Sequence, residues 1–332
     1  MQGVYAVGGS GIASLELRKE AVSLPGPGEA LIRINAATLN FRDLAFITGR
    51  LPGMTKLPDY VPLSCGAGEV VAIGDDVTRV AIGDRVQPLF ALGWLDGPQP
   101  TMDMLGGLAD GVARTHAVFP ADSLIRLPDM LSDLEAATLP CAGLTAWNAL
   151  TLHRPIKPGE WVLCPGTGGV SIAALQFAKA AGANVVITSS SNAKLARARA
   201  LGADVTVNYR DHPDWVSEAR KALGGRGVDV VVDVVGADQF ETNLALLEPG
   251  GLIATIGFLG SEFSWGKEAA GDPRTGRIST GNRKQHEAML GFIAEHSVRP
   301  VVDVVYPLER LADAYRRLEN GRFFGKVGVT LV

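Results

Sequence analysis

The residues with the clearest chemical potential form the run Gly166-Thr167-Gly168-Gly169-Val170-Ser171, which follows a short apolar stretch. Gly166 allows a tight turn, and Gly168 and Gly169 allow backbone N–H groups to approach a pyrophosphate. The N-terminal end of a following helix attracts the same anion. This pattern is typical of a dinucleotide-binding unit, although Ser171 stands where Gly or Ala is usual. A tight turn with only a structural role is the alternative interpretation.

The residues after the glycines predict a helix with a slim apolar stripe. Small and apolar residues recur at i, i+3, i+4, i+7, i+8 and i+11, a spacing that suits a helix lying close on a sheet. The predicted stripe consists of Val170, Ala173, Ala174, Phe177, Ala178 and Ala181.

The end of the next predicted strand indicates which dinucleotide binds. An NAD site normally has an Asp or Glu there, about 20 residues beyond the glycines. The chain instead has Ser189-Ser190-Ser191 followed by Lys194, which suit a 2′-phosphate because charge-assisted contacts contribute roughly 1.5–3 kcal/mol. Tyr209 ends the third strand, where it is placed to cover the adenine edge or donate to the phosphate. We therefore predict NADP(H); alternatively, Ser190 or Ser191 only caps a helix and Lys194 is solvated.

The elements that position these residues alternate regularly between strand and helix. Such alternation predicts an α/β fold with a doubly wound, parallel Rossmann sheet. The predicted strands are 161–164, 184–188, 204–208, 228–235 and 251–257, and the predicted helices are 170–181, 192–201, 213–223 and 238–247.

The first part of the chain is different, because its short strands with Gly and Pro turns suggest a small barrel-like domain. Strand 29–37 carries alternating apolar residues on one face. Segment 92–109 is expected to be an irregular loop, and segment 261–277 a surface loop. Further helices are expected over 283–296 and 308–319. The last strand, 326–332, has no place in the parallel sheet and is expected to return to the first domain.

Composition limits the remaining possibilities. The 332 residues exceed the usual size of one core, and we predict boundaries at 1–125, 126–290 and 291–332, the last completing the first domain. A net charge of −4 predicts no nucleic-acid partner, and no stretch is long and apolar enough to predict a membrane span. The N-terminus does not resemble a signal peptide, and the three cysteines form no C-x-x-C motif, so we expect reduced thiols and a cytoplasmic location.

Several motifs, taken together with the order of domains, extend the interpretation to the whole chain. They are Asn40-Phe41-Arg42-Asp43, Leu63-Ser64-Cys65-Gly66-Ala67-Gly68-Glu69-Val70, Leu139-Pro140-Cys141-Ala142-Gly143-Leu144-Thr145-Ala146-Trp147, the glycine run, and Phe324-Gly325-Lys326. With them the chain resembles the medium-chain dehydrogenase/reductase superfamily, and in particular its zinc-free, quinone-oxidoreductase-like branch. The resemblance implies a GroES-like catalytic domain over 1–125, a Rossmann coenzyme domain over 126–290 and a return segment over 291–332.

The resemblance also implies that no metal is bound. The positions that match the zinc ligands of the zinc-dependent alcohol dehydrogenases carry Asn40, Ser64 and Cys141, and Cys65 replaces a Glu. One thiolate cannot hold a catalytic Zn²⁺, which needs three protein ligands. The superfamily's cysteine-rich structural zinc lobe has no counterpart here.

Reduction of a quinone or an α,β-unsaturated carbonyl demands less electrophilic help than oxidation of a simple alcohol. Arg42 is the candidate to steer or stabilise the oxygen on which negative charge develops, unless it only pairs with Asp43. Asn40 and Thr145 are candidates to hold the nicotinamide ribose and carboxamide; Thr145 is otherwise an ordinary helix hydroxyl. Enoyl reductases of this branch have a tyrosine at the position that matches Leu51, so the proton donor is not identified.

Other cofactor contacts are carried over from family positions, with packing at strand ends as the alternative. They are Phe41, Cys141, Val235, Gly257, Phe258, Leu259, Phe324 and Lys326. The expected substrate is a small carbonyl compound, enone or quinone, and relatives imply a homodimer. A zinc-free alcohol or aldehyde dehydrogenase and a non-catalytic NADP(H)-binding protein remain alternatives.

Overall fold

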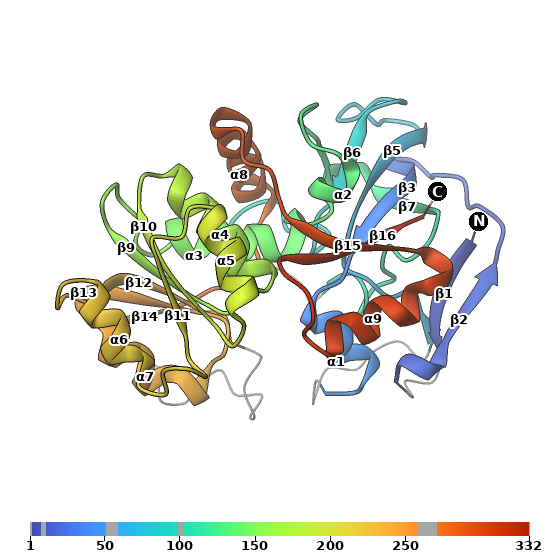
Figure 1. Ribbon diagram of the computed structural model, residues 1–332. Helices are drawn as coiled ribbons and strands as arrows, with labels where there is room; N and C mark the ends of the chain where they lie inside the picture. Colours follow the sequence, from blue (N-terminus) through green and yellow to red (C-terminus); the bar gives the residue numbers. More distant parts are fainter. Residues whose placement is uncertain (1, 8–10, 51–58, 99–102, 258–270, 332) are drawn as a thin grey trace. The chain divides into compact units, whose positions relative to one another are not determined.

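The chain divides into two units (Figure 1). The computed structural model describes residues 2–7, 11–50, 59–98, 103–257 and 271–331. The first unit comprises Met1–Leu144 together with Thr280–Val332, and the second comprises Thr145–Ser279. The C-terminal part of the chain therefore rejoins the N-terminal part, as the pattern of the last strand predicts.

The second unit is built on a parallel sheet, which confirms the predicted α/β class. Within the described residues its strand order is β11-β10-β9-β12-β13-β14, and every pairing is parallel. The strands are β9 (Trp161–Pro165), β10 (Asn184–Ser189), β11 (Val205–Asn208), β12 (Val228–Asp233), β13 (Leu247–Thr255) and β14 (Thr275–Arg277). The order reverses beside β9, so the chain crosses from β11 to β12, which is the switch point at which such sheets bind ligands.

Helices cover this sheet on both faces, with α4 and α5 on one side and α6 and α7 on the other (Figure 1). Apolar side chains of α6 and α7 pack with Leu163, Val186 and Val231 in one buried cluster. The helices of this unit are α3 (Leu144–Thr151), α4 (Gly169–Ala180), α5 (Asn192–Ala200), α6 (Trp215–Ala222) and α7 (Phe240–Leu246), the last preceded by the 3-10 turn η4 (Ala237–Gln239).

The buried face of α4 differs from the predicted stripe. Ala174, Phe177 and Ala178 are buried as expected, but Val170, Ala173 and Ala181 are only partly buried. Ser171, Ile172 and Leu175 are buried in their place. The buried side is thus rotated by about one residue, and on this side the Ser171 hydroxyl donates to the carbonyl of Pro165 at the end of β9.

The segment predicted as a loop over 261–277 ends in a strand. Its residues 261–270 lie outside the described residues, but Thr275–Arg277 forms β14 and extends the sheet beside β13. The prediction is wrong for this part because three residues are too few to show alternation. Ile253 and Thr255 of β13 supply the pairing that the local sequence does not reveal.

The first unit contains antiparallel sheets. A small sheet has the order β2-β1-β4, and a larger one has the order β15-β16-β3-β5-β6-β8, with β7 also pairing with β3. Its strands are β1 (Gln2–Val7), β2 (Leu15–Lys19), β3 (Glu29–Thr38), β4 (Asp59–Tyr60), β5 (Cys65–Ile73), β6 (Arg85–Pro88), β7 (His116–Pro120), β8 (Leu124–Arg126), β15 (Val302–Pro307) and β16 (Lys326–Thr330). Strand β16 pairs antiparallel with β3, which confirms that the last strand returns to the first domain.

The helical elements of the first unit are short except for two near the C-terminus. They are η1 (Ile12–Ser14), α1 (Phe41–Ile47), η2 (Ala121–Ser123), α2 (Asp133–Ala136), the π-helix η3 (Leu139–Gly143), α8 (Arg283–His296), η5 (Leu308–Arg310) and α9 (Leu311–Glu319). The core includes Ile32, Ile34 and Val70 of the sheet and Leu311 and Tyr315 of α9.

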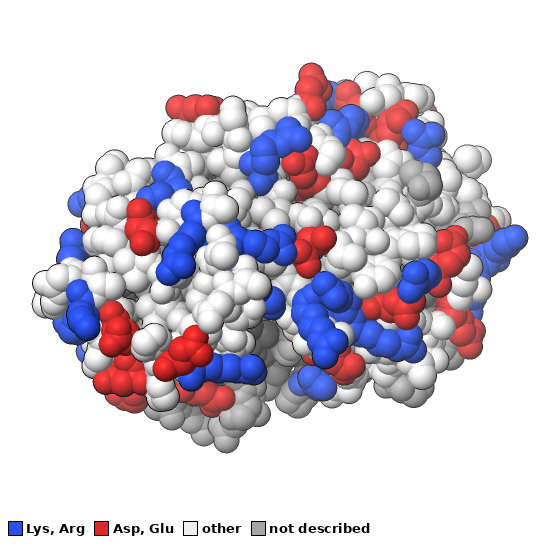
Figure 2. Space-filling model, in the orientation of Figure 1, with Lys and Arg blue, Asp and Glu red and all other residues white. Residues whose placement is uncertain are grey.

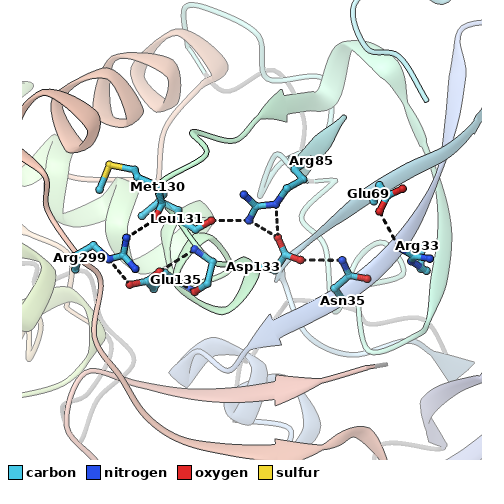
Figure 3. A network of polar contacts seen from close by, with 10 residues as sticks. Arg33, Asn35, Glu69, Arg85, Met130, Leu131, Asp133, Glu135 and Arg299 are labelled. Carbon is cyan, nitrogen blue, oxygen red and sulfur yellow. Dashed lines mark hydrogen bonds and ion pairs between the residues drawn. The ribbon is translucent and has the colours of Figure 1, made fainter. Parts of the chain in front are cut away.

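The unit boundaries differ from the predicted ones at 126 and 290, because polar contacts attach two further segments to the first unit. Figure 3 shows Asp133 of α2 accepting hydrogen bonds from Asn35 of β3 at 2.8 Å and from Arg85 of β6 at 2.6 Å. Segment 126–144 is thereby joined to the first unit. Helix α8 is joined through His286, which lies 2.7 Å from Gln87, and through an ion pair between Glu287 and Arg79.

Charged side chains of both signs lie on the face drawn in Figure 2. Lys and Arg side chains alternate with Asp and Glu on the side drawn in Figure 2, consistent with the small net charge of −4. Among the described residues, no helix is both long and apolar enough to cross a membrane.

Candidate active site

The glycine turn has the geometry that its sequence predicts. Gly166 has φ of +75°, a left-handed conformation that glycine adopts without steric cost, and the predicted tight turn is confirmed. A Cβ added to Gly166 or Gly168 would meet no atom within 4 Å, so open space lies above both residues. Thr167 between them is buried.

The helix that follows has its first N–H groups directed to the same place. Helix α4 begins at Gly169, and its N-cap, Gly168, supplies no side-chain hydrogen bond to the first turn. The Ser171 hydroxyl donates to the carbonyl of Pro165 at 2.6 Å, so the serine that departs from the glycine pattern locks the helix against the strand. Backbone donors and open space thus fit a pyrophosphate.

The serine-rich end of β10 is organised by local hydrogen bonds. Ser189 is buried and its hydroxyl accepts from the amide of Ser191 at 3.2 Å. Ser191 in turn caps α5 by accepting from the amide of Lys194. The capping role weighed for Ser191 is therefore present, and it leaves Ser190 and the half-buried Lys194 side chain as the remaining candidates for a 2′-phosphate.

The neighbouring end of β11 contributes two further side chains. Tyr209 is 44% exposed, and its amide donates to the carbonyl of Ser189. Asn208 is buried and donates to Asn192 at 2.9 Å, joining β11 to the start of α5. Asn208 was missed by the sequence reasoning, although a buried amide at the end of a parallel strand is a recognisable signal.

The ends of β12 and β13 approach each other very closely. A Cβ on Gly257 would lie 2.3 Å from the Cα of Gly236, so this position requires glycine. The Asp233 carboxylate accepts from the amides of Val235 and Gly236 at 3.0 and 3.1 Å and shapes the turn after β12. Val235 is half-buried. The predicted contacts Phe258 and Leu259 lie outside the described residues, as does Leu51.

In the first unit, Asn40 is at the centre of a buried polar network. Its side-chain amide donates to the hydroxyl of Ser64 and to the sulfur of Cys65, both at 3.1 Å. Its oxygen accepts from the ammonium of Lys326. The Asn40 side chain is therefore fully engaged by its own unit, which makes it a group that positions its neighbours.

Asp43 also belongs to this buried network. Its carboxylate accepts from the backbone amide of Asn40 at 2.8 Å and from the Ser64 hydroxyl at 2.9 Å, and it lies 3.3 Å from Arg42. Burial raises the pKa of Asp43, while Arg42, the Asn40 amide and Ser64 act in the opposite direction. Asp43 and Ser64 were quoted in the motifs but given no role; the N-x-x-D spacing typical of a helix cap was the available signal.

Arg42 is held rigidly between two aromatic rings. Its guanidinium carbon lies 4.8 Å from the ring centre of Phe46 and 4.7 Å from that of Phe90, and Nη1 donates to the carbonyl of Leu105 at 2.7 Å. Its Nη2 is buried and has no hydrogen-bond partner in the described part of the chain. The pairing of Arg42 with Asp43 is present, but it leaves this second nitrogen with unused donors.

Lys326 carries a charge in an almost fully buried position. The side chain is 4% exposed, and its ammonium donates to the carbonyl of Leu39 as well as to Asn40. Burial lowers the pKa of Lys326, whereas Cys65, Cys141 and Asp43 act against this change. The ammonium therefore lies within one electrostatic cluster with both thiols.

The predicted site residues are thus divided between the two units. Asn40, Phe41, Arg42, Cys141, Phe324 and Lys326 belong to the first unit, and Phe324 is 1% exposed within it. Thr145, buried in α3, begins the second unit, which also holds the glycine run, the serines, Lys194, Tyr209, Val235 and Gly257. Cys141 packs against the apolar cluster of Phe90, Ala91 and Trp94, which was missed because its residues come from a segment without periodicity.

Comparison with known proteins gives the family. Residues 26–129 match the model of the alcohol dehydrogenase GroES-like domain, and residues 169–295 match that of the zinc-binding dehydrogenase. A zinc-type alcohol dehydrogenase-like protein of Schizosaccharomyces pombe is 40% identical, with 94% of each chain covered.

Solved structures agree with this assignment. The crystal structure of an NAD-dependent alcohol dehydrogenase superposes with a TM-score of 0.90 at 36% identity, covering 100% of both chains. A quinone oxidoreductase of Pseudomonas syringae superposes with a TM-score of 0.81 at 30% identity, covering 99% of both. A mycobacterial protein solved with NADPH gives a TM-score of 0.80 at 26% identity, covering 100% of both.

These matches span the catalytic and coenzyme parts in one continuous alignment. The chain belongs to the medium-chain dehydrogenase/reductase superfamily, as its motifs predict. It is an oxidoreductase of that superfamily, whose members use a nicotinamide cofactor.

Proposed function

We propose that this protein is an NADPH-dependent, zinc-independent reductase of quinones or α,β-unsaturated carbonyl compounds. The observation that carries the proposal is the buried Nη2 of Arg42, which has no hydrogen-bond partner among the described residues while the guanidinium stacks on Phe46 and Phe90. A fixed cationic donor without a partner suits an oxygen that gains negative charge during the reaction.

Zinc independence is supported by the chemistry of the groups around Cys141. The family positions for metal ligands hold the amide of Asn40 and the hydroxyl of Ser64, which are weak ligands for Zn²⁺. The buried ammonium of Lys326 lies in the same cluster and would repel a cation.

The preference for NADPH is supported by the end of β10. The position at which NAD-dependent Rossmann domains normally carry a carboxylate holds Ser189, Ser190 and Ser191, followed by Lys194. The relatives point both ways, since one is described as NAD-dependent and another was solved with NADPH. The side chains of this chain favour NADPH.

Each residue has a defined task in the proposed reaction. When bound, the reduced nicotinamide supplies a hydride. The Arg42 Nη2 donates a hydrogen bond to the substrate oxygen and stabilises its negative charge. Asp43 and Leu105 hold the guanidinium in place by polar contacts, and Phe46 and Phe90 stack on it. Thr145 stays a predicted contact of the cofactor.

The proposal is tested by following NADPH oxidation with a panel of quinones and small enones, with and without a chelator. Oxidation of NADPH by at least one panel member, unchanged by the chelator, is expected. Activity that disappears with the chelator and returns with Zn²⁺ would contradict the metal-free mechanism. Binding of NADPH without any turnover would favour the non-catalytic alternative.

Alcohol or aldehyde oxidoreduction is a second candidate, favoured by the names of the relatives. The same panel is extended with primary and secondary alcohols plus NADP⁺. Faster oxidation of an alcohol than reduction of every quinone and enone would assign this activity instead.

A homodimer is proposed on the edge strand β14. In the described part of the sheet β14 pairs only with β13, so it is the edge strand along which a second copy would add its own strand. Light scattering during gel filtration should give twice the mass of 34.9 kDa; a monomer over the accessible concentration range would reject the dimer.

A further inference from the structure

A series of buried polar side chains in the first unit leads to Arg42 through hydrogen bonds. The ammonium of Lys326 donates to the side-chain oxygen of Asn40, whose amide nitrogen donates to the Ser64 hydroxyl at 3.1 Å. Ser64 in turn donates to Oδ1 of Asp43 at 2.9 Å. The same carboxylate oxygen accepts from Nη1 of Arg42 at 3.3 Å. The side chains that precede Arg42 in this series are each at most 7% exposed, so water does not compete for these bonds.

The direction of the bonds is set at Lys326. An ammonium group only donates hydrogen bonds, so the Asn40 side chain turns its oxygen toward it. The amide nitrogen of Asn40 then faces Ser64 and donates to it. Because the Ser64 oxygen accepts this bond, the hydroxyl proton points to Asp43. A hydroxyl and a guanidinium therefore donate to one carboxylate oxygen.

Asp43 is held from a second side as well. Its Oδ2 accepts from the backbone amide of Asn40 at 2.8 Å, within the capping box of α1. The carboxylate therefore cannot rotate without losing a hydrogen bond. Nη1 of Arg42 donates to this carboxylate and to the carbonyl of Leu105, which fixes the plane of the guanidinium. Nη2, which has no hydrogen-bond partner among the described residues, is the nitrogen left for a substrate oxygen.

The backbone before Ser64 is strained. Leu63 is fully buried and has φ of +69°, a left-handed conformation that residues other than glycine rarely adopt. Glycines make room for it, since a Cβ on Gly111 would lie 2.0 Å from the Leu63 carbonyl oxygen and one on Gly106 would lie 2.6 Å from the carbonyl carbon. The amide of Val112 donates to the same carbonyl at 2.9 Å. Such strain persists only where the surroundings impose it, and it is concentrated at functional sites.

We propose that Lys326 and Ser64 are positioning residues that hold Arg42 in the orientation needed for the substrate oxygen. Lys326 sets the direction of the hydrogen bonds, and Ser64 transmits it to Asp43. This role depends on the proposed function, because Arg42 acts in the proposed reductase site. It differs from the cofactor contact that the family position of Lys326 implies, since the ammonium donates to acceptors of its own unit.

The first test is a double-mutant cycle in the assay with the best quinone or enone. Ser64→Ala and Lys326→Met should each lower kcat by about 10-fold, with little change in the Kd of NADPH. In the Arg42→Lys background neither change should lower kcat further by more than about 2-fold, because the residue that they position is already altered. Thr38→Val is the matched control. It removes another buried hydroxyl of the first unit, which donates to the carbonyl of Ala137 at 2.7 Å, and kcat should not change.

The second test observes Arg42 without any turnover. In the full chain labelled with isotopic arginine, the NMR resonance of the Arg42 side chain is the one that Arg42→Lys removes. Ser64→Ala and Lys326→Met should shift this resonance and speed the exchange of its N–H protons with water, whereas Thr38→Val should leave both unchanged. If Lys326→Met does not fold, Ser64→Ala decides alone, because it interrupts the same series of bonds.

The two tests separate failure of this role from failure of the proposed function. An unchanged Arg42 resonance, a loss of kcat that adds to that of Arg42→Lys, or weakened NADPH binding with normal kcat would overturn the positioning role. A wild type that reduces no quinone or enone, together with a shifted Arg42 resonance in the variants, would reject the proposed function and leave the control of Arg42 by Lys326 and Ser64 in place.

Discussion

At the scale of single residues, the proposed function depends on two cationic side chains. Arg42 is proposed to act on the substrate, and Lys194 is proposed to select the cofactor. Arg42 is rigid, enclosed by aromatic rings and short of one hydrogen-bond partner. Lys194 is half-buried in the first turn of α5, next to the serines at the end of β10. The first can act on a substrate oxygen, and the second can select a phosphate.

Replacing Arg42 should separate catalysis from cofactor binding. Arg42→Lys keeps the positive charge but loses the planar fork that Leu105, Asp43 and the substrate oxygen would share. We expect kcat/KM for the best quinone or enone to fall by about 10²-fold, with little change in the Kd of NADPH. Arg126→Gln, which removes an exposed cation, is the control. Equal losses in both variants would assign Arg42 to a general charge effect.

Replacing Lys194 should reverse the preference for cofactor. Lys194→Glu puts a carboxylate beside the 2′-phosphate, and we expect NADPH to bind about 10-fold or more weakly while NADH binding changes little. Arg199→Glu makes the same charge change in the last turn of α5 and should leave both affinities unchanged. Equal weakening of NADPH and NADH by Lys194→Glu would reject the phosphate site.

At the scale of elements, the parallel sheet depends on glycines for two different reasons. Gly168 opens space at the start of α4, whereas Gly257 lets the end of β13 touch the turn after β12. The sequence alone does not distinguish the roles of these two glycines. The surroundings of a hypothetical Cβ distinguish a glycine kept for a ligand from one kept for packing.

Alanine substitutions should therefore have opposite effects at the two positions. Gly168→Ala meets no atom within 4 Å and has an ordinary φ of −81°, so its thermal midpoint should hardly change while NADPH binds more weakly. Gly257→Ala places a Cβ 2.3 Å from Gly236, and overpacking of this kind costs about 1–3 kcal/mol. Thermal unfolding and cofactor titration of both variants check this. A destabilised Gly168→Ala variant with normal NADPH affinity would contradict the ligand role.

At the scale of the whole molecule, the first unit is assembled from the two ends of the chain. Helix α8 lies far along the sequence from β6, yet His286 is fully buried against Gln87. Burial lowers the pKa of His286 to about 3, so the ring is neutral in the folded protein at all ordinary pH values. The contact that joins α8 to the sheet is therefore sensitive to acid.

This contact should make the protein less stable in acid. The unfolded chain binds a proton at His286 below about pH 6.5, while the folded protein does not until about pH 3. Stability from this residue is thus complete above pH 6.5 and falls by about 1.4 kcal/mol for each pH unit well below it. Urea unfolding at pH 7.5 and 5.0 should show a smaller loss for His286→Gln than for the wild type. His212→Gln, at an exposed position, should behave like the wild type.

The sequence by itself determined the parts of this protein that depend on neighbouring residues. The glycine turn, the order of strands and helices in the second unit and the return of the last strand follow from local patterns of 2 and 3.6 residues and from turn residues. The family followed from the motifs. The short strand β14 was not predicted, because three residues are too few to show a periodic pattern.

Only the tertiary structure decided which distant side chains meet. The stacking of Arg42 on Phe90, the hydrogen bond from Asn40 to Cys65 and the burial of His286 against Gln87 each join separate segments. Such contacts depend on how whole elements pack. A buried polar group needs a hydrogen-bond partner, and the packing of the elements decides which residue lies close enough to be that partner. No local pattern in the sequence predicts these contacts.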